Sequence, residues 1–169
     1  MKTFIILLDG AKGAGKSTVS LLLKDELDNT AFFGLDLVRH LVSDAKANTK
    51  NNEIAYNVMF SMLESFLRQG VNVVIDSGVT EERLKKIQEI IEKNNVNFYF
   101  FHLSASKEVL WKRIQDRPQC NNPDRERFEY IYDILHKKDF SDFEKIDTIQ
   151  NSPEVITKQI YEKIKEDLK

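Results

Sequence analysis

A glycine-rich segment near the start of the chain constrains the fold more than any other feature. Residues 10–17 read Gly-Ala-Lys-Gly-Ala-Gly-Lys-Ser and match Gly-x-x-x-x-Gly-Lys-[Ser/Thr] at every fixed position. The apolar run Thr3 to Leu8 before it predicts a strand buried on both faces, and the residues from Thr18 predict a helix. Strand, loop and helix in this order are the context in which the pattern binds phosphate, so we expect a phosphate-binding loop (P-loop).

The residue types of the P-loop divide the work of holding a nucleotide. Lys16 is expected to reach the β- and γ-phosphates and to act in catalysis, and Ser17 to offer its hydroxyl to Mg²⁺. Backbone N–H groups and the positive end of the following helix should surround the phosphate oxygens. The nucleotide-binding residues expected on these grounds are Gly10, Ala11, Lys12, Gly13, Ala14, Gly15, Lys16, Ser17 and Thr18.

Strand-like and helix-like segments alternate along the rest of the chain. Further strands are predicted at residues 31–35, 71–75, 98–103 and 146–149. Helices are predicted at 18–27, at 54–67 with Gly70 as its cap, from Thr80, at 109–117, at 128–135 and from Ser152. The alternation indicates an α/β fold with a parallel sheet in three layers, whose ligands bind beyond the C-terminal ends of the strands.

The composition is that of one ordinary globular domain, covering residues 1–169. The chain carries 25 Lys and Arg against 27 Asp and Glu, and this balance argues weakly against a general nucleic-acid coat while leaving room for a local basic groove. Cys120 is the one cysteine, so an intrachain disulfide and a cysteine-only zinc site are excluded. The apolar run at the start is too short for a signal peptide, so we expect a cytoplasmic protein without a membrane partner.

Two aspartates follow predicted strands and are expected beside the P-loop. Asp36 suits the general base that orients an acceptor hydroxyl and takes its proton. Arg39 would hold an anionic group of the acceptor or neutralise charge in transfer. The alternative is that Asp36 caps the next helix and Arg39 is solvated. Asp76 ends its strand as a magnesium-linked carboxylate does, and it would act beside Ser17; the alternative is an Asp in a turn.

Other basic residues suggest a lid over about residues 113–127. Arg113 and Arg117 are four residues apart, so they should share one face at the end of their helix and contact nucleobase and phosphate. The alternative is two cations at a helix C-terminus. Arg83, Arg125 and Arg127 are weaker acceptor-side candidates, and for all three we favour the alternative of solvated charges. The histidines at 40, 102 and 136 show no ligand spacing and are expected to be structural or surface residues.

These segments together resemble the small P-loop kinases of the polynucleotide kinase, zeta-toxin and chloramphenicol phosphotransferase group. Asp36-Leu37-Val38-Arg39 looks like the Asp-x-x-Arg of polynucleotide kinases, and Lys112 to Arg117 is similar to the group's Lys-Arg-x-x-x-Arg at the lid. The resemblance implies that Asp36 is the general base and that Arg39 contacts acceptor phosphate. It also implies that Arg113 lies against adenine, that Arg117 contacts phosphates and acts in transfer, and that the strand order is 2-3-1-4-5.

The sequence therefore predicts an ATP- and Mg²⁺-dependent kinase that phosphorylates a hydroxyl, with a polynucleotide 5′-OH as the leading acceptor. An antibiotic, a sugar or a nucleotide is the alternative acceptor. A GTPase-like switch is disfavoured because the nearest match to its guanine motif, residues 136–139, reads His-Lys-Lys-Asp and lacks the Asn. An inactive ATP-binding protein is disfavoured by intact Lys16, Ser17, Asp36 and Asp76.

Overall fold

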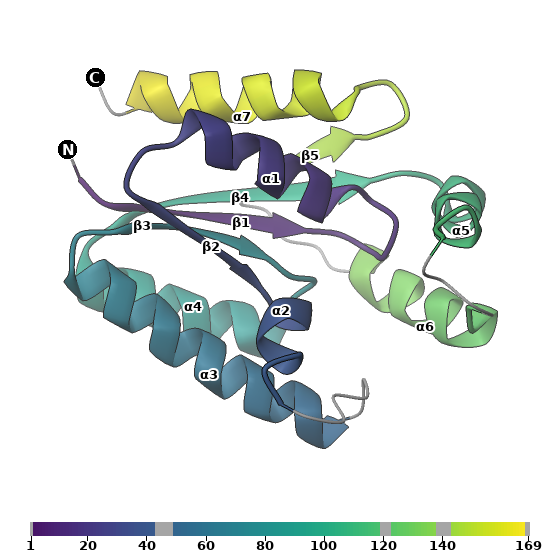
Figure 1. Ribbon diagram of the computed structural model, residues 1–169, viewed down its shortest axis with the longest axis horizontal. Coiled ribbons are helices and arrows are strands. Elements are labelled where there is room, and N and C mark those ends of the chain that lie inside the picture. Colours follow the sequence, from purple (N-terminus) through teal and green to yellow (C-terminus); the bar gives the residue numbers. More distant parts are fainter. Residues whose placement is uncertain (1, 43–48, 119–122, 138–142, 168–169) are drawn as a thin grey trace.

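The computed structural model describes residues 2–42, 49–118, 123–137 and 143–167 and shows a parallel sheet between two layers of helices (Figure 1). The strands are β1 (Phe4–Asp9), β2 (Thr30–Gly34), β3 (Asn72–Asp76), β4 (Asn97–Ser104) and β5 (Glu144–Asp147). The helices are α1 (Lys16–Glu26), α2 (Leu35–Arg39), α3 (Thr49–Arg68), α4 (Glu81–Asn94), α5 (Lys107–Gln115), α6 (Arg125–His136) and α7 (Pro153–Asp167). Within the predicted lid, residues 119–122, with Cys120, lie outside the described residues.

The five strands pair in the order β2-β3-β1-β4-β5, and every pairing is parallel. This confirms the three-layer α/β fold and the strand order implied by the resemblance. β1 lies at the centre, so the P-loop that follows it is delivered to the middle of the sheet edge. β2 and β5 are the outer strands, each paired on one side.

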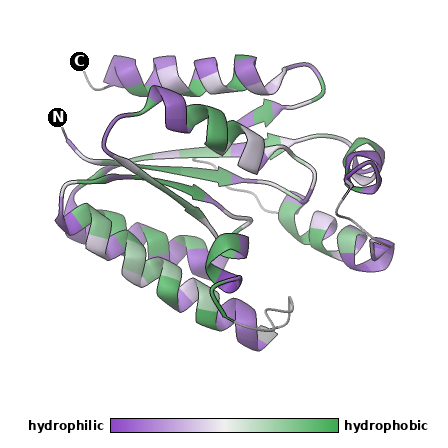
Figure 2. Cartoon of the chain, in the orientation of Figure 1, coloured by the Kyte–Doolittle hydropathy of each residue, from purple (hydrophilic) through white to green (hydrophobic). Residues whose placement is uncertain are grey.

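Two hydrophobic cores cover the two faces of the sheet because alternate side chains of β1 point to opposite sides. Ile6 and Leu8 pack with α1 and α7, whereas Ile5 and Leu7 pack with α3 and α4. All four side chains are fully buried, and the strands are apolar along most of their length (Figure 2). The sequence of a central parallel strand is therefore continuously apolar and does not alternate between apolar and polar residues.

The predicted helices and strands differ from the observed ones mainly at their ends. Gly70 closes α3 as expected, with a φ of 71° and its N–H bonded to the carbonyl of Leu67. β5 was predicted at 146–149 but ends at Asp147, because the Asp147 carboxylate accepts the N–H of Ile149 and turns the chain. None of the helices in the described part of the chain has the length and apolar character needed to span a membrane.

Candidate active site

The P-loop, Asp36 and Asp76 lie at the edge of the sheet where β1, β2 and β3 end (Figure 1). The P-loop follows β1, and α2 begins directly after β2. Asp76, the last residue of β3, is the register partner of both Leu8 and Gly34. Asp76 therefore lies between the strand that leads into the P-loop and the strand that leads into α2, which carries Asp36.

The P-loop turns tightly against α5. Gly13 has a φ of 91°, and a Cβ at this position would lie 2.8 Å from the carbonyl oxygen of Leu110. Both the backbone conformation and the close approach therefore require glycine. Ala11 and Ala14 are buried in the same core, which explains small side chains between the glycines, whereas the side chain of Lys12 is exposed.

Lys16 and the start of α1 offer positive charge at the centre of this edge. The Nζ of Lys16 donates to the carbonyl oxygens of Gly10 at 3.0 Å and Ala11 at 3.3 Å. α1 begins at Lys16, and its N-cap residue, Gly15, supplies no side-chain hydrogen bond. The backbone N–H groups of the first turn, which includes Thr18, are therefore suited to an anion.

Ser17 and Asp76, predicted separately as metal-linked residues, are in direct contact. The Ser17 hydroxyl donates to the Asp76 carboxylate. The hydroxyl of Ser17 and the carboxylate of Asp76 both offer oxygen atoms, the ligands that Mg²⁺ prefers. Among the described residues, no group of three or more His, Cys, Asp and Glu side chains is arranged to hold a metal. The pair thus fits Mg²⁺ that is shared with nucleotide phosphates rather than an ion held by protein alone.

Asp36 and Arg39 form an ion pair whose two members differ in exposure. Arg39 Nη2 lies 2.6 Å from Asp36 Oδ1, and the Arg39 and Asp36 side chains are 11% and 82% exposed respectively. The Nη1 of Arg39 donates to the Oδ1 of Asn52 at 3.1 Å. The N-cap of α2 is Gly34, not Asp36. The alternative of a capping Asp with a solvated Arg is therefore wrong: Arg39 is a buried support, and the carboxylate of Asp36 stays accessible.

The sequence did not single out Tyr56 as a site residue. Its side chain is 4% exposed and contacts the loop that follows β3. Its hydroxyl donates to the carbonyl of Gly78 at 2.8 Å, and the guanidinium of Arg83 lies 3.7 Å from its ring centroid. Tyr56 lies on α3, where apolar residues at helical spacing predicted a helix over 54–67. Two of those apolar residues, Ile54 and Val58, are 38% and 39% exposed. Spacings of three and four residues that start at Tyr56 match the buried face.

The two lid arginines do not share a helical face. Arg113 lies on α5, where its guanidinium donates to the side chain of Thr148 at 2.8 Å and to its carbonyl at 2.7 Å. α5 ends at Gln115, so Arg117 lies beyond the helix and is exposed. The prediction of a shared face is wrong because Pro118 disfavours helical backbone at the residue before it.

A series of polar contacts runs from Asp9, the residue before the P-loop, to His102 and His136. Asp9 is fully buried; its Oδ1 accepts the N–H of Val79 at 2.9 Å, and its Oδ2 lies 2.6 Å from His102 Nδ1. The ring of His102 packs edge-on against that of His136, with centroids 5.4 Å apart. Burial lowers the pKa of His136. The sequence did not indicate Asp9, whose carboxylate joins the loop after β3 to His102 on β4.

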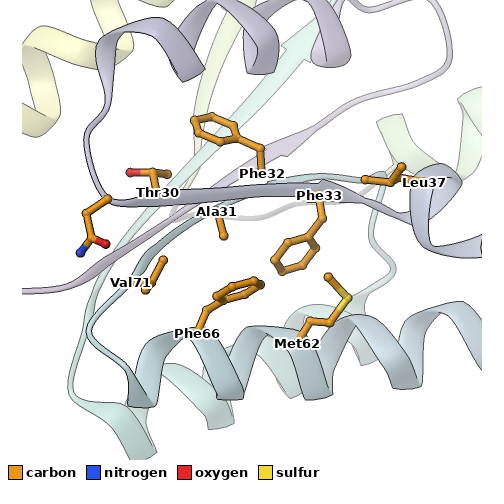
Figure 3. A pocket seen from close by; sticks show the side chains of 9 residues that line it. Thr30, Ala31, Phe32, Phe33, Leu37, Met62, Phe66 and Val71 are labelled. Carbon is orange, nitrogen blue, oxygen red and sulfur yellow. The ribbon is translucent and has the colours of Figure 1, made fainter.

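An apolar groove of about 470 Å³ lies between β2 and α3 (Figure 3). Phe33 and Phe66 stack inside it, with ring centroids 6.0 Å apart, and Phe32 points to the other face of the sheet. Its lining residues are Asn29, Thr30, Ala31, Phe32, Phe33, Leu37, Met62, Phe66 and Val71. Neither the P-loop nor Asp36 is among them, so this groove is separate from the polar edge.

Comparison with known families agrees with this geometry. The sequence profile of a family described as AAA domain matches residues 5–132. The chain belongs to this family. The match takes in the P-loop, Asp36, Asp76 and both lid arginines of this AAA domain, and it ends within α6.

Solved structures with the same fold include proteins named as kinases and a chain of an RNA repair complex. A protein of Chloroflexus aurantiacus, named by inference as a kinase, is 17% identical, with coverage of 98% of both chains and a TM-score of 0.78. A sugar kinase from Janibacter sp. HTCC2649 is 15% identical, with 95% and 92% covered and a TM-score of 0.68. A chain of the Pnkp1/Rnl/Hen1 RNA repair complex is 20% identical, with 82% of this chain and 47% of that chain covered and a TM-score of 0.69. The AAA domain described here thus has a P-loop kinase-like fold.

Proposed function

We propose that this protein transfers the γ-phosphoryl group of ATP to a hydroxyl, with a polynucleotide 5′-OH as the leading acceptor. The observation that carries the proposal is the meeting of three groups at one edge: the P-loop with Lys16, the Ser17–Asp76 pair, and the accessible carboxylate of Asp36. A kinase needs a phosphate grip, a metal-linked carboxylate and a base, and these groups supply all three.

On the donor side, the first-turn N–H groups of α1 would bind the phosphates and Lys16 would neutralise the charge of the transferred group. Its two carbonyl contacts are within the same loop, so the ammonium can exchange them for phosphate oxygens. Ser17 and Asp76 would hold Mg²⁺, which would supply positive charge against the phosphates. Arg113 and Arg117 remain proposed contacts to nucleobase and phosphate.

On the acceptor side, Asp36 would accept the hydroxyl proton as the oxygen attacks the γ-phosphorus. The bond between that phosphorus and the β–γ bridging oxygen breaks, and ADP leaves with the bond's electron pair. Arg39 would keep the carboxylate of Asp36 in place through their ion pair, while its own guanidinium is held by a hydrogen bond to Asn52. The cytoplasm, the predicted location, would supply the ATP.

The acceptor has two candidate classes. The likeness to a chain of the RNA repair complex supports a nucleic-acid 5′ end, and the likeness to the sugar kinase supports a small molecule. Incubation with γ-labelled ATP and a panel of 5′-OH oligonucleotides, nucleosides, sugars and antibiotics separates them. We expect label in the oligonucleotide; label in a neutral small molecule alone would overturn the leading acceptor and keep the kinase.

The Asp36→Asn variant tests the base. The amide keeps the shape but cannot accept a proton, so transfer should fall by about 10²–10⁴-fold while nucleotide affinity is retained. Asp25→Asn, an exposed carboxylate on α1, is the matched control and should leave transfer unchanged. Weakened nucleotide binding with normal turnover would instead assign Asp36 to the donor side.

A further inference from the structure

The guanidinium of Arg83 is held in place without using its hydrogen-bond donors. It lies 3.7 Å from the centroid of the Tyr56 ring, well within the range of a cation–π contact. Within the described segments it forms no ion pair, even with Glu81 and Glu82, which share its helical turn and are exposed. An arginine fixed by its flat face presents its N–H groups to a ligand.

The platform beneath Arg83 is rigid. The hydroxyl of Tyr56 donates to the carbonyl of Gly78 and lies 3.3 Å from the Oγ of Ser77. The same loop is tied to β1 at both ends, through the N–H of Ser77 to Leu8 and the N–H of Val79 to Asp9. Burial raises the pKa of Tyr56, so the ring stays neutral and leaves the charge of Arg83 uncompensated.

Arg83 and Asp36 border the same corner of the sheet. Arg83 is in the first turn of α4, which follows the loop after Asp76, and Asp76 is the register partner of Gly34, two residues before Asp36. Asn52, which accepts from Arg39, and Tyr56, which supports Arg83, lie one turn apart on α3, so the two arginines border the same stretch of that helix. Arg39, by contrast, is 11% exposed and engaged by Asp36 and Asn52.

We propose that Arg83, supported by Tyr56, binds a phosphate group of the acceptor whose hydroxyl lies at Asp36, and that Arg39 only positions Asp36. This rests on the proposed function and narrows it to phosphate-bearing alcohols. A polynucleotide 5′ end and a small sugar phosphate both carry that chemistry. The sequence resemblance implied the opposite division, with Arg39 on the acceptor phosphate. The partners of the two arginines reverse it, because Arg39 donates to Asp36 and Asn52, whereas Arg83 rests on the face of a ring and forms no ion pair within the described segments.

Matched acceptors test the proposal. A nucleoside 3′-phosphate and its parent nucleoside differ by one phosphate, and a sugar phosphate and its parent sugar form a second pair. We expect the full-length protein to favour the phosphate-bearing member by about 10- to 100-fold in kcat/KM, the range of a charge-assisted contact. The pair that shows the preference identifies the source of the phosphate.

Arg83→Ala should reduce that preference to about one through KM, and Arg83→Lys should restore part of it because the charge returns without the flat fork. Lys85→Ala removes an exposed positive charge from the same helix and should keep the preference. Equal use of both acceptors by the unmodified protein would overturn the inference, and so would an equal loss on both in a folded Arg83→Ala protein.

Binding without turnover separates this inference from the proposed function. Calorimetry with the nucleoside 3′-phosphate and the sugar phosphate, in the presence of Mg²⁺ and a non-hydrolysable ATP analogue, measures the Arg83 contact directly. Affinity lost in Arg83→Ala and kept in Lys85→Ala would support the phosphate site even if no acceptor is phosphorylated. If neither ligand binds, or if both variants bind as the unmodified protein does, the phosphate site is wrong, whatever the kinase assay shows.

Discussion

Arg39 and Arg83 show what a sequence leaves undetermined at the scale of single residues. Both follow a strand at the same edge, and the Asp-x-x-Arg spacing singles out Arg39. Both side chains have partners on α3, Asn52 for Arg39 and Tyr56 for Arg83. Because these partners are 13 and 27 residues away along the chain, the contacts could not be predicted from local spacing.

Lys16 carries a prediction at this scale. Its ammonium contacts two carbonyls of its own loop and its side chain is outside the two hydrophobic cores, so Lys16→Ala should leave the free energy of unfolding within about 0.5–1 kcal/mol of the original. Phosphoryl transfer should fall by at least about 10²–10³-fold, because a charge-stabilising group is lost. Urea unfolding and transfer of label from ATP measure the two effects. Near-normal turnover in the folded variant would remove Lys16 from the mechanism.

At the scale of elements, the junction of β2 and α2 depends on one glycine. A Cβ on Gly34 would lie 2.3 Å from the carbonyl oxygen of Asp76 on the paired strand. Strand periodicity gives no sign of this requirement, because the close approach is made by β3. The strand-and-helix order was predictable because hydrophobic runs are local, whereas this contact is not.

Gly34→Ala should therefore destabilise the protein. The added methyl group must push the backbones of β2 and β3 apart, at a cost of about 1–3 kcal/mol in the free energy of unfolding. Urea denaturation followed by circular dichroism measures it. Since β3 ends in Asp76 and β2 leads directly into α2, which carries Asp36, transfer should fall as well. An unchanged unfolding midpoint would show that the sheet absorbs the methyl group.

α6 carries a pH-dependent contribution to stability through His136. Its Nε2 is buried without a hydrogen-bond partner among the described residues, and burial lowers its pKa below the ordinary value of 6.5. The unfolded chain then binds a proton more readily than the folded one, so stability is lost as the pH falls below about 6.5. His102 and Lys145 act in the same direction, and Asp9 opposes them.

His136→Phe retains a flat ring against Tyr132 and removes the titration, so it should flatten the loss of stability between about pH 7 and pH 5. Urea midpoints across that range provide the comparison. His40→Phe, at an exposed position, is the control and should keep the original pH dependence. A variant as acid-sensitive as the parent would assign the effect to other groups.

At the scale of the whole molecule, the sheet and its two cores follow from the sequence more directly than the site does. Continuous apolar runs such as 3–8 predicted a sheet covered on both faces, and β1 has buried residues on both sides. The strand order came from the resemblance alone, since periodicity carries no information on which strands are neighbours. The lid arginines were misplaced because Pro118 acts on the end of α5.

A nucleotide should stabilise the whole fold. The P-loop, which includes Ser17, joins β1 to α1, whereas Asp76 ends β3, so a ligand that joins them binds the folded state alone. At a concentration of 100 times its Kd, Mg²⁺ with a non-hydrolysable ATP analogue should add about 2.7 kcal/mol, or about 5–10 °C in Tm. Thermal unfolding with and without Mg²⁺ measures this.

Ser17→Ala should lower the Mg²⁺-dependent part of that shift, because a metal ligand is lost. Ser61→Ala, an exposed hydroxyl on α3, is the control and should leave the shift intact. An equal shift in Ser17→Ala and the parent would contradict the assignment of the metal pair.

The direct passage from β2 into α2 has a consequence for how proteins of this design diversify. Asp36 reaches its place through backbone pairing of Gly34 with Asp76, and no flexible connector stands between strand and helix. Its position is thus inherited from the sheet. Asn52 and Tyr56, which contact Arg39 and the loop after β3, come from α3. Mutations on α3 can therefore change these contacts while the backbone position of Asp36 is kept. Under the proposed function, new specificities can then evolve around an unchanged carboxylate.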